Sequence, residues 1–304
     1  MKKIQVIFLV LIMAVIVSIC VSASDLHLEN FNLDEIKFQN VNAQTTIVKE
    51  ALGKIELHFL DVGQGDSTLV ILPNNKTMLI DAGKKDHGTS VVNYIKNLNI
   101  SKIDYLVMTH PDADHIGGMS TVIDNFDIGT IYMTDATSTT KTFEDLLLNI
   151  ESKGLTITTL KANDIILESD DFNVTVLSPI KKYDDNNDMS LVIQITYVNN
   201  TFLLMGDAST KAENDILDSN PNLMADLIKI GHHGSSSSSS ARFIEKVSPQ
   251  FAIISSGKNN QYGHPSSKVL ETLERNGVKI YRTDEVGNII AISDGNIINI
   301  EYNT

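Results

Sequence analysis

The spacing of apolar residues along positions 54–304 predicts alternating β-strands and α-helices. Alternation of apolar and polar residues indicates strands at 55–60, 67–72 and 77–80, and an unbroken apolar run indicates a buried strand at 103–108. Further strands are predicted at 128–133, 174–177, 191–198, 202–205, 227–230, 251–255 and 279–282. Helical spacing predicts helices at 91–98, 143–152, 211–217, 241–247 and 269–275. Because the domain does not begin with a βαβα rhythm, we expect mixed sheets flanked by helices.

The first 53 residues have a different pattern, which predicts export. Lys2 and Lys3 precede an uncharged apolar run at 4–19. The small residues at 21–23, Val-Ser-Ala, are typical of a site that signal peptidase cleaves. We therefore expect a signal peptide at 1–23, although the apolar run is also long enough to remain as a membrane anchor. Residues 24–53 are polar and rich in Asn, and we interpret them as a spacer or arm before a domain at 54–304. The expected location is extracellular, or tethered to the membrane by an uncleaved N-terminal segment.

The composition narrows the range of partners. A formal net charge of −14 and a pI of about 4.9 disfavour nucleic acid as a partner, although bound cations can reverse the field locally. Trp is absent and aromatic residues make up 6% of the chain, which argues against a stacking platform. No second long apolar segment follows the first, so we expect no transmembrane channel. The single Cys, Cys20, lies in the expected signal peptide, so nitrogen and oxygen atoms must hold any metal ion.

Four ligand-type side chains lie close together directly after the buried strand at 103–108. They are His110, Asp112, Asp114 and His115. Alternation places His110 and Asp112 on one side of the loop. Asp114 and His115 can face a second point a few ångströms away. This spacing suits two metal ions at the carboxyl end of a strand, where α/β proteins place their sites. The alternative, that these groups only cap the next helix, would leave costly unpaired charge in an apolar setting.

Three later strand ends carry further ligand-type residues. Asp207 follows an apolar strand, where its carboxylate can bridge two ions or cap a helix. His232 and His233 follow another, and because neighbouring residues of an extended chain point to opposite sides, we expect one imidazole to face the metals. His232 and Asp207 each follow a glycine at the end of an apolar strand, so the two residues occupy equivalent positions. We therefore expect His232 to be the ligand and His233 to pack behind the loop. His264 is expected to contact the second ion or a substrate oxyanion.

Together these segments resemble the metallo-β-lactamase superfamily, and specifically its ComEC/Rec2 branch, the hydrolase domain of bacterial DNA-uptake proteins. The segment 110–115, His-Pro-Asp-Ala-Asp-His, is similar to the superfamily's metal-binding signature, with Asp112 at the place of the usual second His. The other matching segments are 60–67, 79–83, 206–207, 231–235, 262–265 and 281–284. The resemblance covers about residues 55–292. It implies an α/β (α+β) fold, an αββα sandwich of two mixed β-sheets with outer helices.

The resemblance also implies how the site is organised. The implied ligands are His110 and Asp112 for one ion, Asp114 and His115 for the other, and Asp207 bridging both. The expected cofactors are two divalent ions, Zn²⁺ or Mn²⁺. Asp81 would support the His110 loop by hydrogen bonds. The further residues expected behind the ligands or against the substrate are Asp61, Asp66, Asn187, His233 and Ser235.

One position departs from the superfamily's pattern. A further His usually lies between the first loop and the bridging Asp, and no residue from 116 to 206 is His. Asn187 or Asp188 is expected to line the site instead, or His232 to fill the vacant corner.

The implied reaction is hydrolysis by a metal-bound hydroxide, whose pKa the metal lowers toward neutrality. Asp114 would orient the hydroxide, His264 would act on the substrate, and Ser235 would hydrogen-bond a polar substrate group. The branch implies a phosphodiester substrate, in a secreted phosphodiesterase or nuclease. A cell-surface phosphodiester of the phosphorylcholine type and a lactone are alternatives. A catalytically silent binding module is disfavoured because the ligand set is nearly complete, and the sequence does not indicate the oligomeric state.

Overall fold

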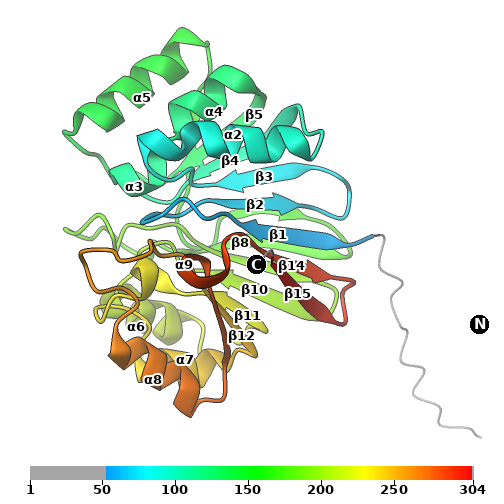
Figure 1. The fold of residues 1–304 in the computed structure, drawn as a ribbon, viewed down its shortest axis with the longest axis vertical. Coiled ribbons are helices and arrows are strands. Elements are labelled where there is room, and N and C mark those ends of the chain that lie inside the picture. Colours follow the sequence, from blue (N-terminus) through cyan, green and yellow to red (C-terminus); the bar gives the residue numbers. More distant parts are fainter. Residues whose placement is uncertain (1–52, 303–304) are drawn as a thin grey trace, which may run out of the picture. The chain divides into compact units, whose positions relative to one another are not determined.

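Two β-sheets, each with helices on its outer face, build the part of the chain that the structure describes (Figure 1). The structure is a computed structural model, and it describes residues 53–302. The expected signal peptide at 1–23, and all of the expected spacer except Gly53, lie outside the described residues.

The first sheet has the strand order β15-β14-β1-β2-β3-β4-β5-β6. Its strands are β1 (Ile55–Phe59), β2 (Thr68–Ile71), β3 (Thr77–Ile80), β4 (Lys102–Met108), β5 (Asp127–Met133), β6 (Ile157–Thr159), β14 (Ile289–Ser293) and β15 (Ile298–Tyr302). The strands from β15 to β3 pair antiparallel, and those from β3 to β6 pair parallel. The accompanying helices are η2 (Lys85–His87), α2 (Gly88–Asn97), α3 (Ala113–Ile116), α4 (Met119–Asn125) and α5 (Lys141–Ser152).

The second sheet has the order β13-β12-β11-β10-β9-β8-β7. Its strands are β7 (Ile165–Glu168), β8 (Phe172–Ser178), β9 (Val192–Tyr197), β10 (Asn200–Leu204), β11 (Leu227–Lys229), β12 (Phe251–Ile254) and β13 (Lys279–Arg282). The strands from β10 to β13 pair parallel, and the others pair antiparallel. The accompanying helices are α6 (Thr210–Ser219), η3 (Gly231–Gly234), α7 (Ala241–Val247), α8 (Ser267–Arg275) and α9 (Thr283–Val286).

Alternating strand residues supply three apolar layers. Leu57 and Phe59 from β1 meet Phe202 from β10 between the two sheets. Leu203, the next residue of β10, faces the other way and packs into the layer under α6, α7 and α8. A similar layer, which includes Ile95 of α2, lies under the helices of the first sheet. Each of these side chains is fully buried and contributes about 1.5–3 kcal/mol to the free energy of folding. The three apolar layers therefore hold the two sheets to each other and to their outer helices.

The predicted sandwich of two mixed sheets with outer helices is confirmed. The apolar pattern missed β6, β7, β14 and β15, which lie at or next to the sheet edges. Edge strands have a weaker pattern because fewer of their side chains are covered; Ile165 of β7 is 54% exposed and Tyr302 of β15 is 43% exposed. Within residues 53–302, no helix has both the length and the apolar character needed to cross a lipid bilayer.

Candidate metal centre

The expected ligand loops meet at one edge of the sandwich, on the left of Figure 1, where α3 and the loop after β4 lie. Strands β3 and β4 run parallel in the first sheet, and β10, β11 and β12 run parallel in the second. Because the carboxyl ends of parallel strands share an edge, the loops that follow them converge. This convergence brings groups of His and Asp side chains from both sheets within 4.8 Å of one another.

Asp81 anchors the loop that follows β4. Its side chain is buried, its Oδ1 accepts a hydrogen bond from the Thr109 amide at 2.9 Å, and its Oδ2 accepts one from the Thr109 hydroxyl at 2.6 Å. His115 Nδ1 lies 2.7 Å from the same Oδ2. The carboxylate therefore keeps the proton of His115 on Nδ1 and leaves Nε2 available, which is how residues behind a metal site orient a ligating histidine.

His110 is oriented by two hydroxyl groups. Its Nδ1 lies 3.0 Å from Thr109 Oγ1 and 3.3 Å from Ser190 Oγ. The Thr109 hydroxyl proton already goes to Asp81, so Thr109 Oγ1 accepts from Nδ1. Ser190 Oγ also accepts from the Asp207 amide at 3.0 Å, so a single serine ties His110 to the Asp207 loop.

Several buried polar atoms in this cluster have no hydrogen-bond partner among the described residues. They are Nε2 of His110, His115 and His233, Oδ1 of Asp207, and Oδ1 of Asp66, which makes an ion-pair contact with His233 Nδ1 at 3.2 Å. His115 Nε2 lies 3.3 Å from Asp207 Oδ1. Unpartnered buried polar atoms are costly, and a divalent cation bound by imidazole nitrogen and carboxylate oxygen would satisfy them together. The residues present therefore fit a metal centre.

The donor atoms form overlapping sets. His110, His115 and Asp207 make one set, and Asp114, His115 and His233 make another. Asp66 joins two more, one with Asp81 and His115 and one with Asp207 and His233. His233 Nε2 lies 3.4 Å from Asp114 Oδ2 and 3.5 Å from Asp207 Oδ2. Asp207 faces the first two sets, with Oδ1 toward His115 and Oδ2 toward His233. The geometry thus allows the Asp207 carboxylate to serve either of these donor sets.

Burial and mutual charge set the protonation of the cluster. Burial, reinforced by the neighbouring His115, lowers the pKa of His110 to about 3. Burial alone would lower the pKa of His233, but the Asp207 and Asp66 carboxylates outweigh it and raise that pKa to about 9. Burial would likewise raise the pKa of Asp207, yet His115 and His233 hold it well below its usual range. Burial would lower the pKa of His115 as well, but Asp207 and Asp81 raise it well above its usual value. A metal ion therefore has to displace a proton from each of these two imidazoles.

The expected division of roles between His232 and His233 is wrong in its geometric premise. β11 ends at Lys229, and residues 231–234 form the 3₁₀ turn η3, in which His232 has φ 48° and His233 has φ 54°. Strand alternation does not apply to two consecutive left-handed residues. His233 is buried within the donor cluster, whereas His232 is partly exposed and its Nε2 lies 3.8 Å from Asp207 Oδ2.

The remaining expected ligands lie at the rim of the cluster. Asp112 Oδ2 is 3.9 Å from His110 Nε2, and the Asp112 side chain is 44% exposed. His264 Nδ1 lies 3.4 Å from Gln64 Nε2, and its ring centroid is 5.7 Å from that of His232. Burial, followed by the charge of His232, lowers the pKa of His264. His264 is therefore neutral near pH 7, with Nδ1 accepting from Gln64 and the proton on Nε2.

Several residues expected behind the ligands or against the substrate bind elsewhere. Asp61 Oδ1 accepts from the Gly63 amide and closes a turn on the exposed surface. The backbone amide of Asn187 donates a hydrogen bond to the Asp185 side chain. The Asp188 carboxylate accepts hydrogen bonds from the backbone amide and the hydroxyl of Ser209 at the start of α6. Neither Asn187 nor Asp188 belongs to the donor sets found among the described residues.

Two expected residues do lie beside the cluster. The Ser235 hydroxyl pairs with that of Ser237 at 2.9 Å, beside His232 Nδ1, which lies 3.4 Å from the Ser237 hydroxyl. Asp66 contacts His233 Nδ1 and is itself bound by Lys229.

Sequence reasoning missed four residues that shape the cluster. They are Thr109, Ser190, Lys229 and Ser255, whose carbonyl oxygen lies 3.1 Å from His233 Nδ1. Only Lys229 could have been noticed in the sequence, because it is a charged residue inside an otherwise apolar strand. The others act through hydroxyl or carbonyl groups that any surface loop carries.

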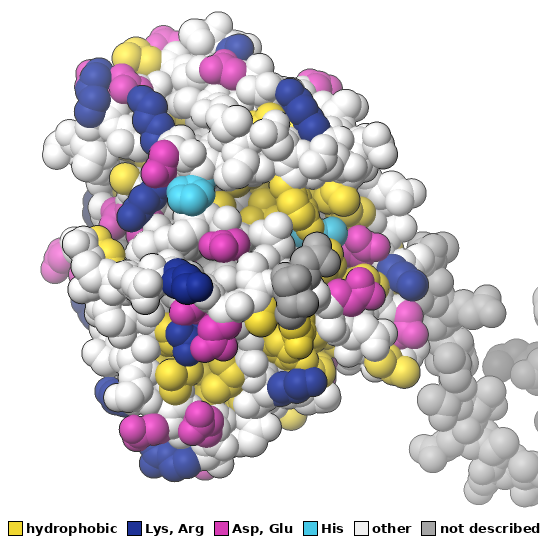
Figure 2. All heavy atoms as spheres, viewed as in Figure 1, with side chains coloured by type: hydrophobic (Ala, Val, Ile, Leu, Met, Phe, Trp, Pro, Cys, Tyr) yellow, Lys and Arg dark blue, Asp and Glu magenta, His cyan; other side chains and the backbone are white. Residues whose placement is uncertain are grey.

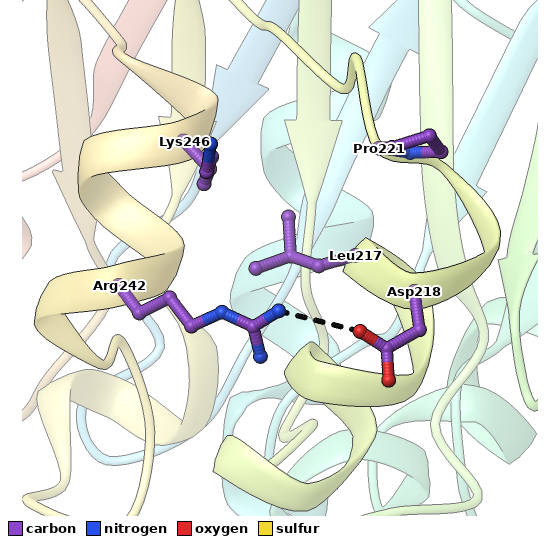
Figure 3. Close-up of a pocket in the computed structure, with 5 residues that line it drawn as sticks. All are labelled: Leu217, Asp218, Pro221, Arg242 and Lys246. Atoms are coloured by element: carbon purple, nitrogen blue, oxygen red, sulfur yellow. Dashed lines mark hydrogen bonds and ion pairs between the residues drawn. The ribbon is translucent and has the colours of Figure 1, made fainter.

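A separate hollow lies between α6 and α7, away from the metal-bearing edge (Figure 3). It has a volume of about 440 Å³ and is lined by Leu217, Asp218, Pro221, Arg242 and Lys246. Figure 3 shows Arg242 directed at Asp218, and their Nη2 and Oδ1 atoms are 3.3 Å apart. This ion pair is exposed, and no histidine lines the hollow, so it does not compete with the His and Asp cluster as a reaction site.

The comparisons with known proteins agree with this geometry. A model of the metallo-beta-lactamase superfamily matches residues 60–258. ComE operon protein 3 of Bacillus subtilis is 32% identical over 252 residues, which cover 77% of this chain and 32% of that protein. Competence protein ComA of Neisseria gonorrhoeae is 32% identical over 231 residues, which cover 75% of this chain and 30% of that protein. The chain thus spans about a third of the length of these relatives.

Solved structures agree on the fold. The metallo-beta-lactamase fold protein YhfI of Bacillus subtilis matches with a TM-score of 0.52 at 12% identity, over 79% of this chain and all of that one. The resemblance seen in the sequence is confirmed: the chain belongs to the metallo-β-lactamase superfamily, in its ComEC/Rec2 branch.

Proposed function

We propose that this protein is a metal-dependent phosphodiesterase. The observation that carries the proposal is that unpartnered buried atoms of His110, His115, His233 and Asp207 fall into overlapping donor sets at the sheet edge. In the proposed centre, Asp114, His115 and His233 hold one ion and His110 holds the other. Asp207 faces both, and Asp112 lies close enough to His110 to join the second set. Zn²⁺ and Mn²⁺ both suit a set of imidazole and carboxylate ligands.

A bound divalent pair supplies Lewis-acid polarisation of a phosphoryl oxygen and a water of lowered pKa. The chain's own groups orient the reactants. Asp114 is partly exposed, and its pKa is held low because His233 and His115 outweigh burial, so the carboxylate stays ionised and can orient a water molecule by accepting a hydrogen bond from it. His264 Nε2 carries its proton toward the rim and can donate to a substrate oxygen. The hydroxyls of Ser235 and Ser237 lie beside His232 and provide further donors.

The resemblance to the DNA-uptake branch supports a nucleic-acid diester as one substrate class, and one of the relatives is named competence protein ComA. The formal net charge of −14 supports a small diester instead. On the face that Figure 2 shows, Lys and Arg side chains are interspersed with Asp and Glu rather than gathered in one basic patch. Of the cations near the site loops, Arg282 is paired with Asp284 and Glu285, and Lys268 bonds to the Ser236 carbonyl. A polyanion would therefore be bound weakly outside the metal centre, which favours a second candidate, a cell-surface diester of the phosphorylcholine type.

One substrate panel tests both candidates. The purified protein is loaded with Mn²⁺ or Zn²⁺, its metal content is measured, and it is assayed on bis(p-nitrophenyl) phosphate, p-nitrophenyl phosphorylcholine, a single-stranded oligonucleotide and a lactone. We expect up to two ions per chain and hydrolysis of the diesters that chelation abolishes and metal restores. Lactone hydrolysis without diester hydrolysis would contradict the proposal, and the ratio of oligonucleotide to phosphorylcholine rates would rank the two candidates.

A further inference from the structure

A buried ion pair lies directly behind the proposed metal centre. Lys229, the last residue of β11, is 2% exposed, and Asp66, on the loop between β1 and β2, is 4% exposed. The Lys229 ammonium donates to Asp66 Oδ2. Because β11 belongs to the second sheet and the Asp66 loop to the first, this pair joins the two halves of the sandwich at the edge that carries the ligands.

The fold alone does not account for this pair. A buried ion pair rarely stabilises a protein more than apolar side chains of similar volume would, because removing two charges from water is costly. The neighbours of Lys229 along the chain, Ile228 and Ile230, are both fully buried and apolar. An apolar residue at position 229 would therefore suit the core at least as well.

The pair continues to His233. His233 Nδ1 donates a hydrogen bond to the Ser255 carbonyl oxygen at 3.1 Å, and Asp66 Oδ1 makes an ion-pair contact with the same nitrogen at 3.2 Å. Both oxygens only accept, so Nδ1 must carry a proton and Nε2 is the atom left facing Asp114 and Asp207.

The backbone does not hold His233 in this orientation by itself. His232 and His233 are consecutive left-handed residues without the freedom of glycine, so the turn is strained and needs further contacts to persist. Backbone hydrogen bonds, such as that from the His232 amide to the Gly206 carbonyl at 3.0 Å, hold the turn, and the Nδ1 contacts orient the His233 ring.

We propose that Lys229 is a positioning residue of the metal centre. By binding one oxygen of Asp66, it fixes the other oxygen against His233 Nδ1 and so keeps Nε2 directed at the ion. This inference rests on the proposed metal centre and extends it by a residue that touches neither ion nor substrate.

The test measures metal binding rather than turnover. Four variants are compared with wild type: Lys229→Met, Asp66→Leu, the double variant, and Lys102→Met as the control. Lys102 is half exposed and pairs with Asp104 on the surface, so its loss removes a lysine from an ion pair without touching the centre. Mn²⁺ affinity is measured by chelator competition. Stability is measured by urea unfolding and the His233 tautomer by ¹⁵N NMR of the imidazole, both on the chelator-treated protein at pH 10, where His233 is neutral.

We expect Lys229→Met to weaken Mn²⁺ binding by about 10–100-fold and to replace the Nδ1–H signal of His233 by a mixture of tautomers. Lys102→Met should bind as wild type. The double variant should unfold at the same or higher urea concentration than wild type, yet bind Mn²⁺ no better than Asp66→Leu, because Lys229 acts only through Asp66.

Two results would overturn the inference. One is wild-type Mn²⁺ affinity in Lys229→Met, and the other is affinity that recovers with stability in the double variant, since the pair would then be merely structural. If Lys229→Met does not fold, the double variant and Asp66→Leu decide the matter by themselves. Wild-type protein that binds no metal would refute the proposed function together with this inference, whereas binding unaffected by Lys229→Met would refute the inference alone.

Discussion

Raising the pH from 7 to 9 is expected to strengthen metal binding, with about a hundredfold coming from one histidine alone. The structural reason is His233, whose pKa is raised to about 9 by the Asp207 and Asp66 carboxylates against the opposing effect of burial. An ion that binds Nε2 must displace the proton, so each pH unit below 9 weakens binding about tenfold, or about 1.4 kcal/mol. Two units correspond to about 2.7 kcal/mol. His115, whose pKa is also raised well above its usual value despite burial, adds to the slope.

The metal-free protein should respond to pH in the opposite direction. The folded pKa of His233 lies above its unfolded value, so the group contributes stability that is fully present below about pH 6.5 and is lost as the pH rises through 9. The loss amounts to about 3 kcal/mol for this fully buried group. Metal affinity therefore rises over the pH range in which the stability of the metal-free protein falls.

Two measurements at matched pH values examine this reasoning. Mn²⁺ affinity is measured by chelator competition at pH 7, 8 and 9, and urea unfolding is measured with chelator present at the same values. The variant His233→Gln should lose about one unit of slope in both plots, and His87→Gln should lose none, because His87 belongs to none of the donor sets in the described part of the chain. A wild-type affinity that is flat between pH 7 and 9 would refute the proton-displacement argument.

Four further outcomes are expected. Asp207→Asn should lower diester hydrolysis by about a hundredfold or more with the fold intact by circular dichroism, because the amide lacks the charge to face two cations; full rate and metal content would exclude the bridging role. His233→Ala should lose bound metal, whereas His232→Ala should keep most of it and mainly raise KM, as metal analysis and kinetics would show. Phe202→Ala should lower the free energy of unfolding by about 3–5 kcal/mol in urea, and a loss under 1 kcal/mol would place it outside the core. N-terminal sequencing of protein from the native host should begin after residue 23, and a start at residue 1 on cytosolic protein would exclude export.

Much of the fold followed from local patterns. The buried strand β4 appears in the sequence as an unbroken apolar run, and β1 and β3 appear as alternating segments, because side-chain direction in a strand has a period of two. The dense segment from His110 to His115 identified the family, since so many ligand-type groups in one short loop have few other uses.

Tertiary structure decided how the site is divided among its residues. His232 and His233 are chemically identical neighbours, and their roles depend on the left-handed turn η3, which no local propensity of histidine predicts. Lys229 became part of the site because β11 and the Asp66 loop come from different sheets and meet only when the sandwich closes. Asn187 and Asp188 have suitable side chains, but the chain uses them for a turn and for the start of α6. The sequence by itself determined which chemistry is present, because ligand type is a property of each residue. Only the packing of the two sheets decided which atoms face one another, because that depends on contacts between residues far apart in the chain.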